Sequence, residues 1–557
     1  MSTYPWIKSY PKSVPAKIED NRPENLLEVF DNCCKQFADR EAFENMGKVL
    51  TYREVDEYST HFAAYLQNNF GLKKGDRIAI QMPNCLQYPI ALIGAQKAGC
   101  VVVNTNPLYT PREMEHQFND ADVQALVIVA NFAHSLQEIL HKTPIKHVIV
   151  TELGDMLGGL KGKIVNFVIK RVKKMVPAYQ LPKVIKFKSA LAQGARLSYT
   201  KPEVKSSDTA FLQYTGGTTG VSKGATLSHA NVVAHTSQIS SWFNPLLKEG
   251  QAEIMITAIP LYHIFALNVN CTFMMHVGAK NVLITNPRDM PGFIKELKKH
   301  KFTLITGVNT LFNGLLSQEE FKEVDFSQMK GCIGGGMAVQ DFVARKWEEV
   351  TGSPLAEGYG LSETSPVLCC NPLDGTHKLG TIGLPVSSTE IAIMDDAGNQ
   401  LPQGEAGEIC ARGPQVMSGY WGRDNSDVFF EGQWFRTGDI GLMDEDGFFK
   451  IVDRKKDMIN VSGFNVYPNE VENVIADHEK VLEVAAIGIP DAKSTECVKV
   501  FVVKADESLT EDELREYCKQ ELTGYKRPKF IEFRNDIPKS NVGKILRRKL
   551  KEEEGVV

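Results

Sequence analysis

The amino-acid sequence predicts an α/β fold with a large N-terminal domain and a smaller α+β C-terminal domain. At 557 residues the chain is too long for one ordinary hydrophobic core, so two or more domains are expected. In the first half, short β-branched segments alternate with helical patterns, which is typical of βαβ units in a largely parallel sheet. From about residue 376, turn signals recur at short intervals, as in antiparallel strands, and a second αβ pattern forms the tail.

The first half supplies the elements of the predicted parallel sheet. Apolar residues at helical spacing predict helices over residues 26–40 and 52–70. Short β-branched runs predict strands over residues 77–82, 100–106, 125–130, 147–151, 252–260 and 281–286.

The second half supplies hairpins and then the tail. A β-rich region over about 376–452 contains two predicted hairpins, "MDDAGNQLP" (394–402) and "MDEDGFFKI" (443–451). The residue pattern of the tail predicts helices over residues 466–478 and 510–522. Between them it predicts two strands, over residues 481–490 and 497–504. The charged segment "DRKKD" (453–457) separates the two regions, so we divide the chain into 1–452 and 458–557 at this segment.

The composition is typical of a soluble globular protein, with 43% hydrophobic and 24% charged residues. A net charge of −5 argues against binding of nucleic acid. The eleven cysteines form no CxxC pair, which predicts reduced thiols in a cytoplasmic protein rather than disulfides or a zinc site. Because the N-terminus lacks an apolar signal region and no run of 18 apolar residues occurs, neither a secretory signal nor a transmembrane helix is expected.

The stretch "LQYTGGTTGVSKG" (212–224) predicts a phosphate-binding loop that follows a strand over 211–214. Glycines let the backbone approach a ligand closely, and successive N–H groups form an anion-binding nest. Threonine hydroxyls and the Lys223 ammonium add donors for phosphate oxygens. The Walker pattern is absent because Gly224 follows Lys223, which disfavours a P-loop NTPase. Taken alone, the stretch could also be an ordinary Gly/Thr-rich turn.

Four further motifs follow this loop in the chain. They are "GYGLSET" (358–364), "WFRTGDIG" (434–441), "DRKKDMINVSGFNVYPNEVE" (453–472) and "PKSNVGKILRRKL" (538–550). Together the motifs resemble those of the adenylate-forming enzymes, which include acyl-CoA synthetases, luciferases and nonribosomal peptide adenylation domains. Over essentially its whole length, including "IPLYHIFAL" (259–267), the chain is similar to bacterial long-chain fatty acyl-CoA synthetases of the FadD type.

This resemblance implies a fold and a reaction. The N-terminal adenylate-forming domain would consist of βαβ sheets and a small distorted β-barrel, and the C-terminal domain would be mobile. A fatty acid would attack the α-phosphate of ATP to give acyl-adenylate and pyrophosphate. The thiol of CoA would then attack the acyl carbon and release AMP. ATP, Mg²⁺ and CoA are thus the expected cofactors and co-substrate, and the product would feed β-oxidation and lipid metabolism.

Four residues are the expected catalytic groups, and the resemblance supplies most of their roles. Lys544 corresponds to the adenylation lysine, and Lys223 closes the phosphate loop. Glu363 is the candidate ligand for Mg²⁺, with Thr215 or Thr218 as a second ligand, because Mg²⁺ prefers carboxylate and other oxygen ligands. His263 borders the expected acyl pocket, although a histidine among aromatic residues is often only a core residue.

The other expected contacts concern the nucleotide and CoA. Asp439 would accept hydrogen bonds from the ribose hydroxyls, and Arg454 would contact ribose or phosphate. Lys456 occupies the hinge position of the family, and Gly463 leaves room for pantetheine. The full expected set is Tyr214, Thr215, Gly216, Gly217, Thr218, Thr219, Gly220, Lys223, Gly335, Glu357, Gly358, Tyr359, Gly360, Leu361, Ser362, Asp439, Arg454, Lys456, Gly463 and Lys544.

Residues 161–188 contain nine Lys or Arg and no Asp or Glu. Such a segment can rest on an anionic membrane surface, or it can be a solvated basic helix on the body of the protein. We expect a cytoplasmic protein at the inner face of the cell membrane, and the sequence leaves a homodimer open. Other functions that the sequence leaves open are acyl-AMP ligation, CoA ligation of another acid, and adenylate binding without turnover.

Overall fold

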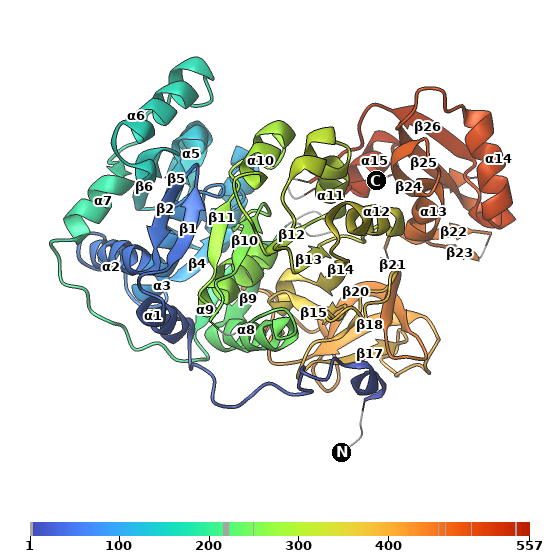
Figure 1. Ribbon diagram of the computed structural model, residues 1–557, viewed down its shortest axis with the longest axis horizontal. Helices are drawn as coiled ribbons and strands as arrows, with labels where there is room; N and C mark the ends of the chain where they lie inside the picture. The colour runs from blue at the N-terminus through green and yellow to red at the C-terminus, as the bar shows by residue number, and fades with distance from the viewer. Residues whose placement is uncertain are drawn as a thin grey trace.

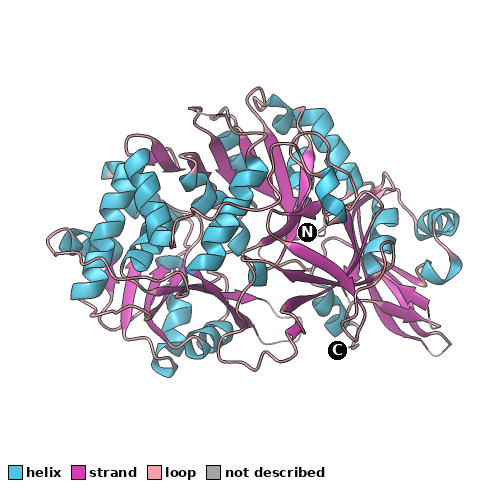
Figure 2. Ribbon diagram, turned by 90° about the horizontal axis from the view of Figure 1, so that it is seen from below, coloured by secondary structure: helices cyan, strands magenta, loops and turns pink. Residues whose placement is uncertain are grey.

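The computed structural model describes residues 4–215, 222–248, 250–454, 456–462, 464–491, 493–540 and 543–556. Within them the chain forms four β-sheets. Figure 1 shows the first two-thirds of the chain at one side and the C-terminal residues at the other, with strands β17–β21 beside them. Figure 2 shows helices packed against the sheets over most of the N-terminal part. The predicted α/β class, with a large N-terminal and a smaller C-terminal domain, is confirmed.

The first sheet has seven strands in the order β7-β6-β5-β3-β4-β8-β9. All its neighbours are parallel except β8 and β9, which form the antiparallel edge. Its strands are β3 (Arg77–Gln81), β4 (Val101–Asn104), β5 (Val123–Val129), β6 (His147–Thr151), β7 (Ile185–Lys186), β8 (Thr209–Thr215) and β9 (Lys223–Ser228). The strands predicted over 77–82, 100–106, 125–130, 147–151 and 211–214 are confirmed.

The second sheet has nine strands in the order β16-β15-β14-β13-β12-β10-β11-β1-β2. Its centre is parallel, and β2, β15 and β16 are antiparallel to their neighbours. Its strands are β1 (Glu41–Asn45), β2 (Lys48–Thr51), β10 (Ile254–Thr257), β11 (Lys280–Leu283), β12 (Leu304–Gly307), β13 (Gly331–Gly335), β14 (Leu355–Gly360), β15 (Val367–Cys370) and β16 (Leu384–Pro385).

Helices pack around these two sheets. The α-helices are α1 (Leu26–Gln36), α2 (Tyr52–Asn68), α3 (Gln87–Lys97), α4 (Pro111–Asp120), α5 (Ala133–Ile139), α6 (Gly159–Phe167), α7 (Phe187–Gly194), α8 (His229–Phe243), α9 (Met274–His276), α10 (Met290–Leu297), α11 (Asn309–Leu316) and α12 (Asp341–Thr351). The same part of the chain contains two π-helical segments, η5 (Val168–Val172) and η6 (Ala266–Phe273), and the 3-10 turn η8 (Ser362–Thr364). Thr51 starts α2 with a reciprocal capping box with Glu54, which satisfies two backbone N–H groups.

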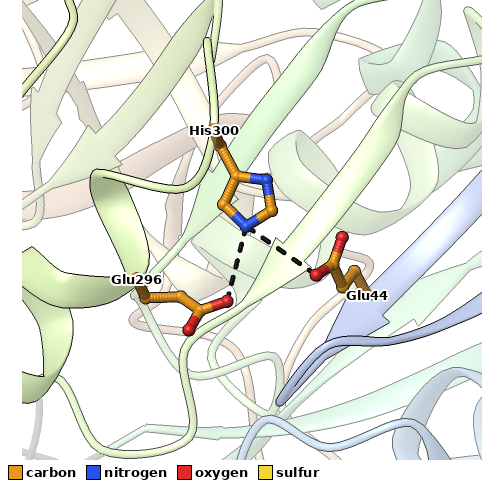
Figure 3. A group of neighbouring side chains, drawn as sticks. All are labelled: Glu44, Glu296 and His300. Carbon is orange, nitrogen blue, oxygen red and sulfur yellow. Dashed lines mark hydrogen bonds and ion pairs between the residues drawn. The ribbon is translucent and has the colours of Figure 1, made fainter.

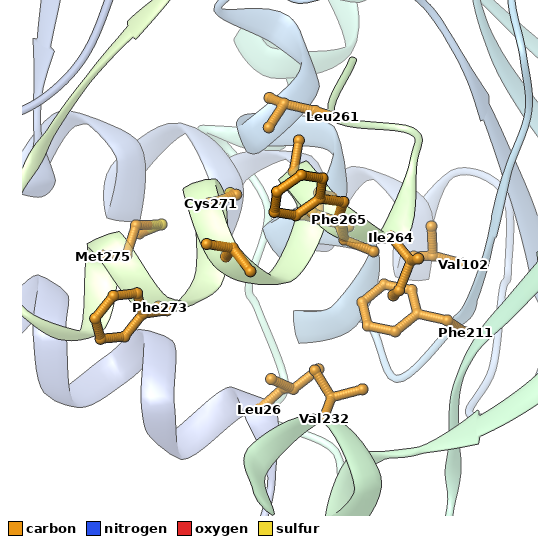
Figure 4. Packing of buried hydrophobic residues seen from close by; sticks show 14 of the residues in the cluster. Leu26, Val102, Phe211, Val232, Leu261, Ile264, Phe265, Cys271, Phe273 and Met275 are labelled. Carbon is orange, nitrogen blue, oxygen red and sulfur yellow. The ribbon is translucent and has the colours of Figure 1, made fainter. Parts of the chain in front are cut away.

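The main hydrophobic core lies between the two sheets. Every residue of α3 is buried, and its polar residues, Gln87, Gln96 and Lys97, lie at its two ends. Figure 4 shows side chains from α1, β4 and β8, among them Leu26, Val102 and Phe211, converging with the segment that contains Phe265 and Phe273. The segment that carries the candidate His263 is therefore fixed by the core.

The β-rich region forms a five-stranded antiparallel sheet in which β21 pairs with β20. Its strands are β17 (Glu390–Met394), β18 (Gly407–Arg412), β19 (Phe429–Phe430), β20 (Trp434–Met443) and β21 (Phe449–Arg454). Both predicted hairpin turns are present, after β17 and between β20 and β21. The described strands pair as an open sheet, so the expected distorted barrel is not closed by hydrogen bonds.

The C-terminal residues form the fourth sheet and have a hydrophobic core of their own. The strands are β22 (Ile459–Val461), β23 (Phe464–Val466), β24 (Val481–Asp491), β25 (Thr495–Lys504) and β26 (Phe530–Arg534). The helices are α13 (Pro468–Ala476), α14 (Glu511–Glu521) and α15 (Arg547–Glu553). This part meets α11 of the body, where Thr310 Oγ1 lies 3.4 Å from the carbonyl oxygen of Gly543.

Two sequence expectations concern thiols and membrane spans. All eleven cysteines are buried and carry free thiols. Among the described helices, none combines the length and apolar character that crossing a bilayer requires.

Candidate functional site

The candidate residues come from three sheets that meet where parallel strands end. β8 ends at Thr215, and β14 ends at Gly360 just before η8. Both β8 and β9 contact η8. Ligands of open α/β sheets bind beyond the carboxyl ends of the strands, so this is the expected position for a nucleotide.

Asp439 is held by two other candidate residues. The Tyr359 hydroxyl donates a hydrogen bond of 2.7 Å to Asp439 Oδ2, and Arg454 Nε lies 3.3 Å from Oδ1. Asp439 is buried, and its strand partner across β20 and β21 is Arg454 itself. The pairing of β20 with β21 therefore fixes a carboxylate and a guanidinium side by side, a geometry suited to ribose and phosphate.

Glu363 is buried and is engaged by a residue that the sequence analysis did not predict. The Tyr420 hydroxyl donates a 2.6 Å hydrogen bond to Glu363 Oε1. Burial raises the pKa of Glu363, whereas this hydrogen bond lowers it. The Lys223 ammonium lies 5.2 Å from the centre of the Tyr420 ring, within cation–π range. Tyr420 thus links the candidate metal ligand to the cation at the end of the phosphate loop.

The backbone around Tyr420 explains its position. Trp421 N–H donates to the Gly224 carbonyl, and Thr226 N–H donates to the Gly419 carbonyl. These bonds join residues 419–421 to β9, which carries Lys223. Residue type alone gave no signal for this contact, because it depends on pairing between segments about 200 positions apart.

Lys544 enters the site from the C-terminal domain. Its side chain lies beside Gly336 at the end of β13, and a Cβ atom on that glycine would be 3.6 Å from Lys544 Cε. A short turn holds the lysine, because Ser540 N–H donates to its carbonyl and Gly543 adopts a φ of 85°, which favours glycine. Burial, and then the nearby Arg454 charge, lower the pKa of Lys544 to about 8, while Asp439 and Glu363 act in the opposite direction.

His263 and Glu357 lie at the border of the same region. Burial, reinforced by the Lys544 charge, lowers the pKa of His263 to about 3, so its imidazole is neutral near pH 7. Burial raises the pKa of Glu357 to about 8, although the Val339 N–H donates to its carboxyl oxygen at 3.3 Å. A largely neutral Glu357 can therefore donate as well as accept a hydrogen bond.

The glycines of β13 and β14 bring backbones close together. Gly335 pairs with Gly358 in the parallel register, and a Cβ on Gly335 would lie 3.0 Å from the Phe265 ring. A Cβ on Gly360 would lie 1.8 Å from the Pro366 carbonyl oxygen, so no larger residue fits there. Leu361 and Ser362 follow directly and lead to Glu363.

The remaining candidates are placed less centrally. The Tyr214 hydroxyl donates to Asp120 Oδ2 at 2.6 Å, and Thr215 pairs with Lys223. Lys456 is exposed. Predicted residues outside the described part of the chain are Gly216, Gly217, Thr218, Thr219, Gly220 and Gly463.

A second group of metal-ligating residue types lies at α10 and β1. Figure 3 shows the His300 imidazole between the carboxylates of Glu44 and Glu296. The Lys280 ammonium is 2.6 Å from Glu44, however, and Lys299 pairs with Glu296. The His300 hydrogen bond and Lys299 lower the pKa of Glu296 to about 2. These ammonium groups already balance the carboxylates, so we interpret the group as an ion-pair network rather than as a cation site.

The buried Glu363 carboxylate and the Thr215 hydroxyl at the end of β8 have the oxygen chemistry that Mg²⁺ prefers. Mg²⁺ binds through one or two carboxylates together with substrate phosphates.

Comparison with known proteins identifies the family. A long-chain-fatty-acid–CoA ligase of Salmonella typhimurium is 56% identical over 549 residues, which cover 98% of this chain and 98% of that protein. The crystal structure of the anthranilate CoA ligase AuaEII in complex with anthranoyl-AMP has the same fold, with a TM-score of 0.84 at 24% identity, and the match covers 95% of this chain and 98% of that one. ATP-bound MatB from Rhodopseudomonas palustris gives a TM-score of 0.77 at 25% identity, covering 95% and 99%.

Residues 30–421 match the AMP-binding enzyme family, and residues 470–544 match the AMP-binding enzyme C-terminal domain. The first match alone extends over more than half of the chain. The chain therefore belongs to the AMP-binding enzyme family.

Proposed function

We propose that this protein is a long-chain-fatty-acid–CoA ligase that uses ATP, Mg²⁺ and CoA. The observation that carries the proposal is the 56% identity, over 98% of both chains, to a ligase of that name. The site geometry supports it, because a buried carboxylate, two lysines and a ribose-binding carboxylate gather where the strands end. The expected product would supply β-oxidation and lipid metabolism.

Adenylation brings a carboxylate against a polyphosphate, so the site must offset repulsion between anions. In our proposal Lys223 and Lys544 supply positive charge from the loop end and from the C-terminal domain. Asp439, oriented by Tyr359 and Arg454, accepts the ribose hydroxyls. Glu363, with Thr215 and Thr218, would hold Mg²⁺, which when bound offsets the charge of the phosphate oxygens.

The thioester step needs a path for the thiol that the first step does not use. We propose that residues 458–557 form a mobile C-terminal domain that turns about the hinge 453–457, with Lys456 at its centre. Residues 1–452, including the β-rich part over about 376–452, would remain the acyl- and nucleotide-binding domain. The turn would bring Gly463 toward the site, and His263 would border the acyl chain.

A product assay tests the proposed function. The purified enzyme is incubated with ATP, Mg²⁺, CoA and fatty acids of increasing length. AMP, pyrophosphate and acyl-CoA are expected in equal amounts. An acyl-AMP ligase would leave CoA unused, an ATPase would release phosphate, and an adenylate-binding protein would yield no product, so each of these results would refute the proposal.

We also propose that residues 161–188 attach the enzyme to the cytoplasmic face of an anionic membrane. Figure 1 places α6 at the outer edge of the molecule, far from the C-terminal domain. Leu160 is 72% exposed and Phe167 is 61% exposed, and Ile164, Val172 and Met175 are also exposed. Apolar side chains at the surface beside nine basic residues suit insertion into the headgroup region of a bilayer.

Replacing Lys170, Arg171, Lys173 and Lys174 with glutamine is expected to weaken binding to anionic vesicles at least tenfold, since each basic residue contributes about 1 kcal/mol. Co-sedimentation with vesicles that contain or lack anionic lipid measures the effect. The matched control changes four exposed basic residues elsewhere, Lys301, Lys322, Arg345 and Lys519, to glutamine. If the two variants bind anionic vesicles equally well, residues 161–188 are not the membrane-binding surface.

A further inference from the structure

A buried guanidinium lies close to the candidate adenylation lysine in the chain. Arg547 follows Lys544 by three residues and begins α15. Its Nε and Nη2 atoms donate to the two carboxyl oxygens of Glu472, at 3.0 and 2.6 Å, and Nη2 also donates to Asn469 Oδ1 at 2.5 Å. The side chain is only 14% exposed, so these charge-assisted bonds are shielded from water.

The same guanidinium approaches two carboxylates of the segment 453–457. Arg547 Nη1 lies 3.9 Å from Asp453 Oδ1 and 3.6 Å from Asp457 Oδ2. Lys551, one turn further along α15, lies 3.7 Å from Asp457. The helix that follows Lys544 is thus attached to the segment that connects the two domains.

Asp453 is the first residue of the hinge, and strand pairing ties it to the N-terminal domain. It lies in β21, where it pairs with Ile440 of β20, and its side chain is fully buried. Its Oδ1 accepts the Arg454 N–H at 2.6 Å, and its Oδ2 accepts the Asn469 N–H at 2.9 Å. The next residue, Arg454, contacts Asp439, so Asp453 is one residue away from the nucleotide site.

The partners of Asp453 lie on both sides of the proposed hinge. Ile440 lies before the hinge and Arg454 lies within it, whereas Asn469 and Arg547 follow it. A turn of the C-terminal domain about 453–457 would carry Asn469 and Arg547 away from β21. A buried carboxylate that loses its hydrogen-bond donor and its counter-charge is strongly destabilised, so these contacts favour the arrangement that the structure shows.

We infer that Asp453 and Arg547 are positioning residues for adenylation: their contact across the hinge holds Lys544 in the nucleotide site. The inference rests on the proposed two-step function and assigns neither residue a contact with substrate. Because the contact would be broken in the second step, its removal should affect the first step selectively.

Separate assays of the two half-reactions on the full-length enzyme test this inference. ATP–pyrophosphate exchange measures adenylation, and conversion of supplied acyl-adenylate and CoA to acyl-CoA measures thioester formation. Asp453→Asn, which removes the charge but keeps the shape, is expected to slow adenylation about tenfold, as for the loss of one buried charge interaction. Thioester formation should stay within about twofold of wild type, because the contact is absent in that step.

Glu472→Gln is the matched control. It removes a carboxylate charge that also pairs with the Arg547 guanidinium, but both residues of that pair lie after the hinge, in the C-terminal domain. It should lower thermal stability without separating the two half-reactions. An equal loss of both half-reactions in Asp453→Asn, or no loss, would overturn the inference. If Asp453→Asn does not fold, Arg547→Lys, which keeps the charge but loses the fork of donors, gives the same comparison with the same two outcomes.

The activity of the wild-type enzyme in the two half-reactions distinguishes an error in this inference from an error in the proposed function. If wild-type enzyme catalyses neither half-reaction, the proposed function is wrong. If wild type catalyses both and the variants lose them in parallel, only the positioning role is wrong.

Discussion

Replacement of Lys544 by alanine is expected to slow adenylation by about 100- to 1000-fold, the usual cost of removing one preorganised charge from a reacting centre. The structure places this ammonium beside Gly336 and within the influence of Arg454, Asp439 and Glu363. Thioester formation from supplied acyl-adenylate should persist, because the attack of a thiol on the acyl carbon does not need this charge. Assays of the two half-reactions measure the difference.

The pH dependence gives an independent check on Lys544. Its pKa is lowered to about 8, so the ammonium is present below pH 8 and is lost as the pH rises above it. The pH dependence of kcat/KM reports the pKa values of the free enzyme. For the adenylation reaction, kcat/KM for ATP should therefore fall above about pH 8. Lys544→Arg keeps its charge throughout this range and should lose the alkaline decline, even if its rate is lower. An unchanged decline in the arginine variant would assign it to another group.

Local patterns in the sequence predicted most individual elements. The β-branched runs over 147–151 and 481–490 became β6 and β24, and the hairpin over 443–451 became the β20–β21 turn. Such runs specify a buried strand by themselves. The order of the strands could not be predicted from local patterns, because it depends on packing. The alternation by itself indicated only a largely parallel sheet, whereas the resemblance implied several sheets, and the structure has two, the second completed by antiparallel β2, β15 and β16.

The sequence motifs predicted individual residues of the candidate site, but not the contacts between residues of different motifs. The motifs of the resemblance predicted roles for Asp439, Glu363 and Lys544, and the structure places all three near one another. It gave no indication of Tyr420, whose hydroxyl reaches Glu363 across 57 positions, or of Arg547, which bonds Glu472 across 75. Contacts of this kind depend on the relative placement of sheets and domains, which residue spacing does not encode.

Replacement of Glu363 by glutamine is expected to reduce adenylation at least ~100-fold and to raise the Mg²⁺ concentration needed for half-maximal rate. Glutamine keeps the size of the side chain and can still accept the Tyr420 hydrogen bond, but it removes the negative charge that a divalent cation requires. The Glu363 side chain is buried, so its charge is not readily replaced by solvent. Initial rates over a Mg²⁺ titration measure both quantities.

Glu296→Gln provides the matched control, because Glu296 is a carboxylate of the ion-pair network around His300 and lies outside the nucleotide site. Its loss should lower stability slightly, as for a partly exposed ion pair, and should leave the Mg²⁺ dependence unchanged. If Glu363→Gln keeps the wild-type Mg²⁺ dependence while Glu296→Gln shifts it, the cation binds at the His300 network, and Glu363 serves only to anchor Tyr420.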